Sequence, residues 1–249
     1  MSVRRRILGI SDSQAVFVPA WKQPDFVDLI RAHTNTPAPI ICYFGAARGH
    51  QPDRAADFFK LAERVGCRVT SLDLFAMATG DPLDYFSNAD AVFIDGGVTR
   101  NLIALLKEWD AVEALIDAYR NGMLIAGASA GISMMFDWCV SDSIKTEIQP
   151  VRGIGLLQGT LCAHYDVLEA RRQVLDDLIR TTPNTLPAYG LEDGVAVLFE
   201  DEVFAETFSI RSNAKLHVFD LEESGIRHAV SSAQRPRAAG FGQVDQKGR

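Results

Sequence analysis

The chain has 249 residues, of which 47% are hydrophobic and 23% are charged, and its formal net charge is -7. These values are ordinary for one large globular domain with a substantial core. The acidic balance disfavours nucleic-acid binding, which requires a positive field, and no apolar run is long enough to cross a bilayer. We therefore expect a protein that binds neither nucleic acid nor membrane.

The N-terminal segment and the cysteines indicate the compartment. The only basic run, VRRR at residues 3–6, is predicted to be a solvated arm, and the segment LGISDSQAVFVPAW that follows breaks any apolar leader with Ser and Asp. The four cysteines form no CxxC pair and mostly lie in apolar runs, so we expect buried free thiols in a reducing cytoplasm: Cys42, Cys67, Cys139 and Cys162. No cofactor or metal motif is present, and none is expected to be needed.

Apolar, β-branched runs alternate with helix-period segments through the first half of the chain. The predicted strands are residues 39–47, 67–75, 89–97 and 123–127, and the predicted helices are 56–66 and 100–122, the second ending at Gly122. This rhythm predicts an α/β fold with a mostly parallel, doubly wound sheet and helices on both faces. Such sheets bind ligands at the carboxyl ends of their strands.

The second half continues with a strand at 158–166, a helix at 167–182 and four closely spaced strands at 189–191, 194–200, 203–210 and 214–220. The close spacing predicts antiparallel hairpins at one edge of the sheet. Residues 231–249 are polar and without periodicity, which predicts a mobile tail. We expect a single α/β domain over residues 1–230.

The segment GASAG, residues 127–131, fits the pattern G-x-S-x-G between a predicted strand and a helical segment, SAGISMMFDW. A strand-to-helix turn of this kind lifts a serine above the sheet, and its small neighbours let the helix approach the strand. The helix N-terminus would add free N–H groups beside Ser129. The same turn could instead use Ser129 only as a helix cap.

A serine hydroxyl needs a base to act as a nucleophile. Of the five histidines, His164 is the best candidate because it ends a predicted strand, although it could also be structural; the others are His33, His50, His217 and His228. Asp142, in the loop-like VSDS, is better placed to orient an imidazole than Asp137, which is expected to lie on the helix after the serine.

GASAG, the upstream DGGVTRNLIALLKEW and the downstream AHYD together resemble peptidase family S51, which contains dipeptidase E and cyanophycinase. The similarity runs over roughly residues 37–200 and implies a class I glutamine amidotransferase-like fold. It implies Ser129 as nucleophile, His164 as base and Asp142 as the acid of the triad. It also implies that the N–H groups of Gly97 and Ala130 form the oxyanion hole.

The sequence departs from this family at two places near the expected site. Val98 stands before Thr99 where the family usually has Asn or Asp, which leaves Thr99 as the polar group expected to contact substrate. LGISDSQ stands where these proteins usually have a Gly-rich turn.

The resemblance also bears on the substrate. Arg171 matches an arginine implicated in binding a substrate aspartate, whereas Val174 stands where a second arginine is expected. Only arginine can hold a carboxylate with two parallel hydrogen bonds. Arg171 and Arg172 could also form a solvated helix face. Glu192 and Asp193 match an acidic segment of the family to which we assign no role from the sequence.

The function expected from the sequence is a serine exopeptidase-like hydrolase that cleaves a small peptide or amide through an acyl-enzyme. The sequence leaves open whether the protein is a homodimer. One alternative is an esterase of the α/β-hydrolase type with His228 as the base, although no further βαβ unit follows to position it. Another is a catalytically silent binding protein on the same fold. A glutamine amidotransferase is disfavoured because position 129 is not cysteine.

Overall fold

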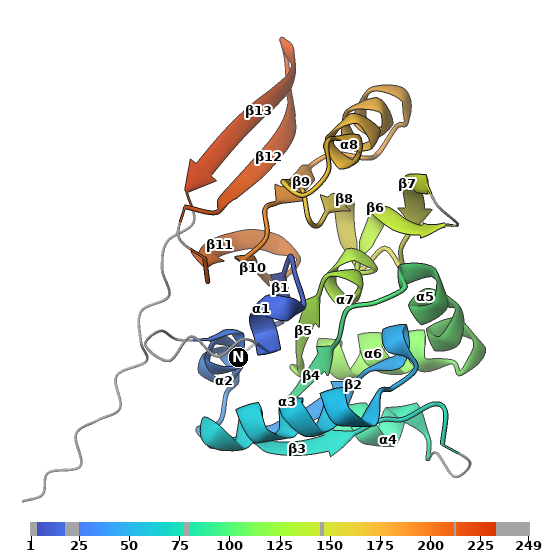
Figure 1. Cartoon of the computed structure of the whole chain (residues 1–249), viewed down its shortest axis with the longest axis vertical. Helices are drawn as coiled ribbons and strands as arrows, with labels where there is room; N and C mark the ends of the chain where they lie inside the picture. The colour runs from blue at the N-terminus through green and yellow to red at the C-terminus, as the bar shows by residue number, and fades with distance from the viewer. Residues whose placement is uncertain (1–3, 18–24, 77–79, 145–146, 212, 233–249) are drawn as a thin grey trace, which may run out of the picture.

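The computed structural model describes all residues except 1–3, 18–24, 77–79, 145–146, 212 and 233–249. Two β-sheets form its framework (Figure 1). In spatial order, the seven-stranded sheet consists of β11 (Val203–Ser209), β10 (Val195–Glu200), β1 (Arg6–Ile10), β5 (Leu124–Ala128), β4 (Ala91–Ile94), β2 (Ile40–Phe44) and β3 (Arg68–Ser71). The six-stranded sheet consists of β13 (Gly225–Ser232), β12 (Lys215–Glu222), β9 (Ala188–Leu191), β8 (Leu157–Cys162), β6 (Phe136–Ile144) and β7 (Glu147–Arg152).

The helices connect and cover these strands. They are α1 (Gln14–Phe17), α2 (Phe26–His33), α3 (Pro52–Arg64), α4 (Pro82–Ser87), α5 (Thr99–Glu108), α6 (Ala111–Arg120), α7 (Ala130–Ser133) and α8 (Glu169–Thr181), with a short 3-10 helix, η1, at Ala46–Arg48. The five strands β1, β5, β4, β2 and β3 pair in parallel, as do β6, β8 and β9. The predicted α/β fold with a mostly parallel sheet is confirmed.

Three groups of buried side chains hold the layers together. One face of the seven-stranded sheet packs on α2 and α3 through residues such as Phe26 and Phe58. The other face packs on α5 and α6 and shares a continuous core with the six-stranded sheet, which contributes Leu161 and Leu191. A third, smaller cluster joins α8 to the six-stranded sheet. Removing this much apolar surface from water is the main stabilising term of the fold.

The predicted hairpins are present but are divided between the sheets. β10 and β11 form the antiparallel edge of the seven-stranded sheet, whereas β12 and β13 form an edge of the six-stranded sheet. The chain crosses from one sheet to the other between β9 and β10. This crossing at residues 192–194 carries the acidic pair that the sequence left without a role.

Two expectations about local structure are wrong. The predicted helix at 100–122 is two helices, because Asp110 adopts a left-handed conformation, φ 51°, between α5 and α6. The helix after Ser129 has four residues, and the apolar segment that follows it forms β6, so Asp137 and Asp142 both lie on a strand. Strands β1, β7 and β13 were not predicted. Of the predicted tail, residues 231–232 belong to β13 and 233–249 lie outside the described residues.

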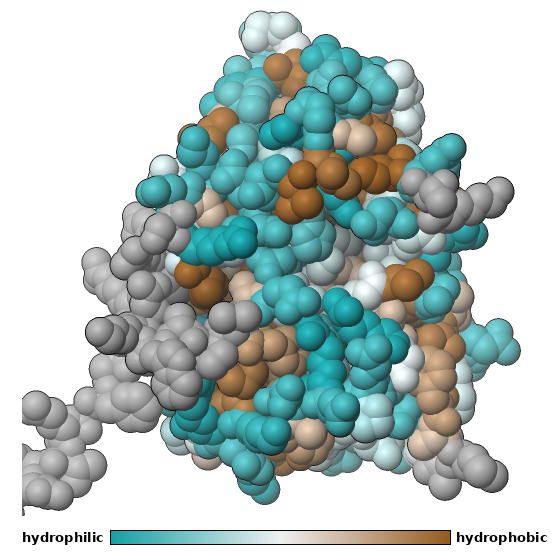
Figure 2. Space-filling model, in the orientation of Figure 1, coloured by the Kyte–Doolittle hydropathy of each residue, from teal (hydrophilic) through white to brown (hydrophobic). Residues whose placement is uncertain are grey.

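Most of the face seen in Figure 2 is hydrophilic, and its hydrophobic side chains form separate groups. The exposed apolar residues include Leu221 and Val230, on the β12–β13 hairpin. Within the described ranges, no helix combines the length and apolarity needed to span a membrane. All four cysteines are buried free thiols.

Candidate active site

Ser129 lies in a strained turn between β5 and α7. Its backbone has φ 50° and ψ -109°, and its N–H donates to the carbonyl of Ile10 over 2.9 Å. A non-glycine residue in this conformation costs about 1–3 kcal/mol, which the surrounding contacts must offset. A Cβ on Gly131 would lie 2.1 Å from the Ile94 carbonyl oxygen, and one on Gly127 would lie 2.6 Å from Gly131. The glycines of GASAG are therefore required by close packing, as predicted.

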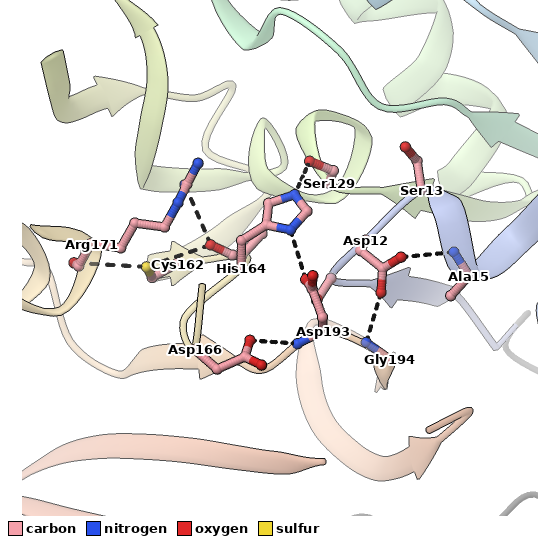
Figure 3. Close-up of polar contacts among 12 residues, drawn as sticks. Asp12, Ser13, Ala15, Ser129, Cys162, His164, Asp166, Arg171, Asp193 and Gly194 are labelled. Carbon is pink, nitrogen blue, oxygen red and sulfur yellow. Dashed lines mark hydrogen bonds and ion pairs between the residues drawn. The ribbon is translucent and has the colours of Figure 1, made fainter. Parts of the chain in front are cut away.

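His164 follows β8 and faces Ser129 (Figure 3). Its Nε2 atom lies 2.9 Å from Ser129 Oγ. The backbone of His164 also has a positive φ, 57°, and the next residue, Tyr165, donates its N–H to Leu191. The predicted serine and histidine therefore come together, from the ends of β5 and β8 in different sheets.

The other imidazole nitrogen is held by Asp193. His164 Nδ1 lies 2.7 Å from Asp193 Oδ1, and the hydroxyl of Ser11 donates to the same oxygen over 3.0 Å. Burial acts to raise the pKa of Asp193, but the hydrogen bonds and charges of its neighbours, His164 first, hold it below the usual value. The ionised carboxylate only accepts, so Nδ1 carries the proton and Nε2 is free to accept from Ser129.

The link that carries Asp193 is fixed by carboxylates on both sides (Figure 3). Asp166 accepts from the N–H of Asp193, and Asp12 accepts from the N–H of Gly194, each over 2.8 Å. Glu192 accepts from the N–H of Lys215 at the start of β12. These contacts tie the link to both sheets and set the position of the Asp193 carboxylate.

Asp142 does not contact His164, so its expected place in the triad is corrected to Asp193. Asp142 pairs instead with Arg171, with Nη2 and Oδ2 2.8 Å apart. Its side chain is 66% exposed, whereas that of Arg171 is 6% exposed. The reason is its place on β6: the strand carries Asp142 toward α8, and the Asp193 link occupies the position behind the imidazole.

Gly97 and Ala130 lie beside Ser129 with unused backbone donors. No hydrogen bond to the N–H of either residue is present in the described part of the chain, and both residues line the same pocket as Ser129. Gly97 has φ 149°, and a Cβ there would lie 2.4 Å from the Ala47 carbonyl oxygen. The pair can therefore serve as an oxyanion hole, the role that the sequence assigned to it.

A buried ionic network supports the Gly97 loop. Asp95, fully buried at the end of β4, accepts from the N–H of Gly96 over 2.7 Å and from the Tyr43 hydroxyl over 3.1 Å. The guanidinium of Arg54 pairs with the same carboxylate and donates to the carbonyl of Ser13. The network links the loop after β4 to the loop after β1.

A cavity of about 400 Å³ lies beside Ser129 and is lined by the triad residues and the two oxyanion-hole residues. Its wall includes the predicted Thr99 and Arg171 as well as Ser13, Arg48, Ser141 and Arg211. Thr99 is buried and accepts a hydrogen bond from Ser141 over 3.1 Å. The described residues contain no group of three or more His, Cys, Asp or Glu side chains suited to a metal ion.

The sequence left the roles of Ser11, Asp12, Ser13 and Asp193 unassigned. The first three form the SDS segment directly after β1, a central strand of the parallel sheet. Polar residues at the carboxyl end of such a strand are a signal of a site, and the signal was missed because β1 was not predicted.

The other histidines lie elsewhere. His228, on β13, has its Nε2 atom 3.1 Å from Nδ1 of His217 and stacks on Phe219. His50 contacts Ser71, and His33 contacts the carbonyl of Leu29. Each of these histidines is engaged in contacts of its own, and none of them is among the residues that line the cavity beside Ser129.

A serine, a histidine and an aspartate in one hydrogen-bonded chain, beside two free backbone N–H groups, define the site of a serine hydrolase on an α/β fold. The model of peptidase family S51 matches residues 7–207, and the chain belongs to this family of peptidases. It is 31% identical over 207 residues to the uncharacterized peptidase YgaJ of Bacillus subtilis, covering 82% of this chain and 89% of that protein.

Two further comparisons agree. Peptidase E of Streptomyces coelicolor is 30% identical over 125 residues, which cover 46% of this chain and 51% of that protein. The crystal structure of a peptidase from an acI-B1 Actinobacterium has the same fold, with a TM-score of 0.69, 13% identity and coverage of 94% of this chain and 96% of that one. The chain is therefore a peptidase, and the contacts from Ser129 through His164 to Asp193 fit the serine type.

Proposed function

We propose that this peptidase hydrolyses short peptides, dipeptides above all, through an acyl-enzyme formed on Ser129. The observation that carries the proposal is the continuous contact from Ser129 through His164 to Asp193. The cavity of about 400 Å³ suits a substrate of a few residues.

In the first half-reaction, Ser129 Oγ attacks the scissile carbonyl while His164 Nε2 takes the hydroxyl proton. The N–H groups of Gly97 and Ala130 hold the oxyanion that forms. When the C–N bond breaks, His164 returns the proton to the departing amine, and the acyl group remains on Ser129. Asp193 holds the imidazole in the required tautomer and stabilises its charged form throughout.

In the second half-reaction, water adds to the ester carbonyl and His164 takes its proton. The ester bond then breaks, the acid product leaves, and the proton returns to Ser129. The enzyme is regenerated with one water consumed per bond cleaved. The groups used in these steps are water, the side chains of Ser129, His164 and Asp193, and the two backbone N–H groups.

Thr99 and Arg171 are proposed to contact the substrate from the cavity wall. Arg171 already pairs with Asp142 and donates weakly to the carbonyls of Val140 and Ala163. Since its charge is already paired with Asp142, we expect Arg171 to give only a modest preference for an N-terminal aspartate.

The test is release of free amino acids from dipeptides with Asp, Glu, Asn, Gly or Leu at the N-terminus. We expect wild-type protein to cleave members of this panel and Ser129→Ala to lose at least about 10³-fold in kcat. Ser87→Ala, on α4 and outside the cavity lining, is the matched control and should retain activity. Tight peptide binding without turnover in folded wild-type protein would instead support the silent binder.

We also propose a cytoplasmic location and assembly as a homodimer. A cytoplasmic location fits the four buried free thiols and can be checked by fractionation. A homodimer can be checked by light scattering of the purified chain. The exposed Leu221 and Val230 of the β12–β13 hairpin are the residues to substitute if a dimer forms.

A further inference from the structure

Arg48 lies at the rim of the active site on the side formed by β2. It ends the short helix η1, and its side chain lines the same cavity as Ser129. The position at which a Cβ of Gly97 would stand is 2.8 Å from Arg48 Cγ, so the arginine lies against the proposed oxyanion loop. Its Nη2 donates to the hydroxyl of Ser13 over 3.0 Å.

The positive charge of Arg48 is not paired with an acidic side chain of the described residues. Two other arginines near the site have acidic partners: Arg54 pairs with Asp95, and Arg171 pairs with Asp142. No ion pair of Arg48 is present among the described residues, and its buried Nε has no hydrogen-bond partner there. The Nε of Arg171 is also buried without a partner, so the distinguishing feature of Arg48 is a guanidinium at the cavity wall without an ion pair, which suits an anionic ligand.

Ser13 adds a second donor at the same place. Its oxygen accepts from Arg48, which leaves its own proton free, and no acceptor for that proton is present in the described structure. Ser13 is buried and lines the cavity. A Cβ on Gly96 would lie 3.1 Å from Ser13 Cβ and 3.0 Å from Ser129 Cβ, which places Ser13 next to the nucleophile. Figure 3 shows the two serines rising on the same side of the sheet.

The charges of the cavity wall indicate which anion fits. Three arginines are balanced by three aspartates in the lining: Arg48, Arg171 and Arg211 against Asp12, Asp142 and Asp193. Each aspartate makes at least one hydrogen bond to the protein, whereas in the described part of the chain neither Arg48 nor Arg211 forms an ion pair, and the charge of Arg211 acts on Asp193. One monovalent, planar anion such as a carboxylate therefore suits this position better than a phosphate dianion.

We propose that Arg48, with the hydroxyl of Ser13, is a specificity-determining residue that binds a carboxylate of the peptide substrate beside the oxyanion loop. The inference rests on the proposed peptidase function, whose substrates supply that carboxylate from the C-terminus or from an acidic side chain. It explains how this site selects peptides short enough for the carboxylate to reach Arg48.

The test compares wild-type protein, Arg48→Gln, Ser13→Ala and Arg68→Gln on four peptides: Asp-Leu, Ala-Leu and their C-terminal amides. Arg68, exposed on β3, is the matched control. If Arg48 binds the C-terminal carboxylate, Arg48→Gln should lower kcat/KM roughly 10- to 100-fold for the two free acids and about twofold or less for the amides, mainly through KM. If Arg48 binds the side-chain carboxylate, the same loss should appear with the two aspartyl peptides instead.

An equal loss on all four peptides would show that Arg48 only supports the loop, and no loss would show that it does not meet the substrate; either result overturns the inference. Calorimetric binding of the same peptides to Ser129→Ala and to Ser129→Ala/Arg48→Gln separates recognition from catalysis. Arg48-dependent binding without wild-type cleavage would refute the proposed function and retain the inference. If none of the four peptides binds Ser129→Ala, the inference fails.

Discussion

Asp193 and Asp142 both line the cavity, but they differ in what they touch. Asp193 accepts from His164 and Ser11, whereas Asp142 contacts Arg171 and is largely exposed. A carboxylate on the far nitrogen of the imidazole fixes the tautomer that can accept from the serine. Only Asp193 meets this requirement.

We therefore predict that Asp193→Asn lowers kcat by about 10⁴-fold, the size of the corresponding loss in the Ser-His-Asp template. Asp142→Asn, at an exposed side chain, should change kcat by about threefold or less and act mainly on KM through Arg171. Steady-state kinetics of the two purified variants measure the difference. A larger loss of kcat in Asp142→Asn than in Asp193→Asn would reverse the assignment.

The lowered pKa of Asp193 also predicts how stability depends on pH. A carboxyl whose pKa is lower in the folded state contributes stability above its unfolded pKa, about 3.9, and this contribution is lost as pH falls through the folded pKa. The difference in Tm between wild-type protein and Asp193→Asn should therefore be constant near pH 6 and shrink below about pH 4. Thermal scans at pH 6, 5, 4 and 3 test this, and a gap that widens toward pH 3 would contradict it.

Ser129 and His164 could be predicted from the sequence as partners, because each follows a buried strand with a recognisable pattern. The sequence could not identify Asp193. The link at residues 192–194 joins strands of different sheets, and the pattern of apolar runs does not show which sheet a strand enters. Asp142 was chosen because VSDS reads as a loop, whereas it lies on β6.

Helix α7 is the element that presents Ser129, and its position depends on how closely it packs on β4. The space for a Cβ on Gly131 is taken by the backbone carbonyl of Ile94, at 2.1 Å. Backbone cannot rotate away as a side chain can, so the whole helix would have to move.

Gly131→Ala is accordingly expected to destabilise the protein by about 1–3 kcal/mol, or roughly 3–10 °C in Tm, and to lower kcat by displacing Ser129. Gly80→Ala is the control, because the one described atom within 4 Å of its Cβ would belong to the Tyr85 ring, at an ordinary 3.4 Å. Differential scanning calorimetry and kinetics on both variants provide the readouts. If Gly131→Ala melts and turns over like wild type, the close packing does not position the serine.

Elements were predictable from the sequence where periodicity was strong and uninterrupted, as in β2, β4, β5 and α8. Elements were not predictable where the hydrophobic pattern suited both a helix and a strand. The apolar segment after Ser129 suits a helix as well as a strand, and pairing with β7 and β8 makes it β6. β13 is exposed along nearly all of its length and is a strand because β12 pairs with it.

On the scale of the whole molecule, the active site lies between two sheets that share a core. Ser129 and the oxyanion loop belong to the seven-stranded sheet, and His164 belongs to the six-stranded one. The shared apolar cluster contains Ile94 and Ile125 from the first and Leu161 and Leu191 from the second. Such a core favours one cooperative unit over two independent ones.

We predict that peptidase activity and far-UV circular dichroism are lost in a single transition in urea, with the same midpoint. A six-stranded sheet that unfolded first would abolish activity at a lower urea concentration than the main loss of secondary structure. That result would divide the chain into two units and contradict the single domain expected over residues 1–230.

The hydrogen bond between Ser11 and Asp193 joins residues 182 positions apart, and that between Asp12 and Gly194 spans the same interval. A ribosome-bound chain thus carries its nucleophile long before the acid that orients the base has been made. A nascent or truncated chain that ends before residue 193 lacks the aspartate of the catalytic triad. The fold thereby delays the appearance of peptide-cleaving activity until the link at residues 192–194 has been synthesised.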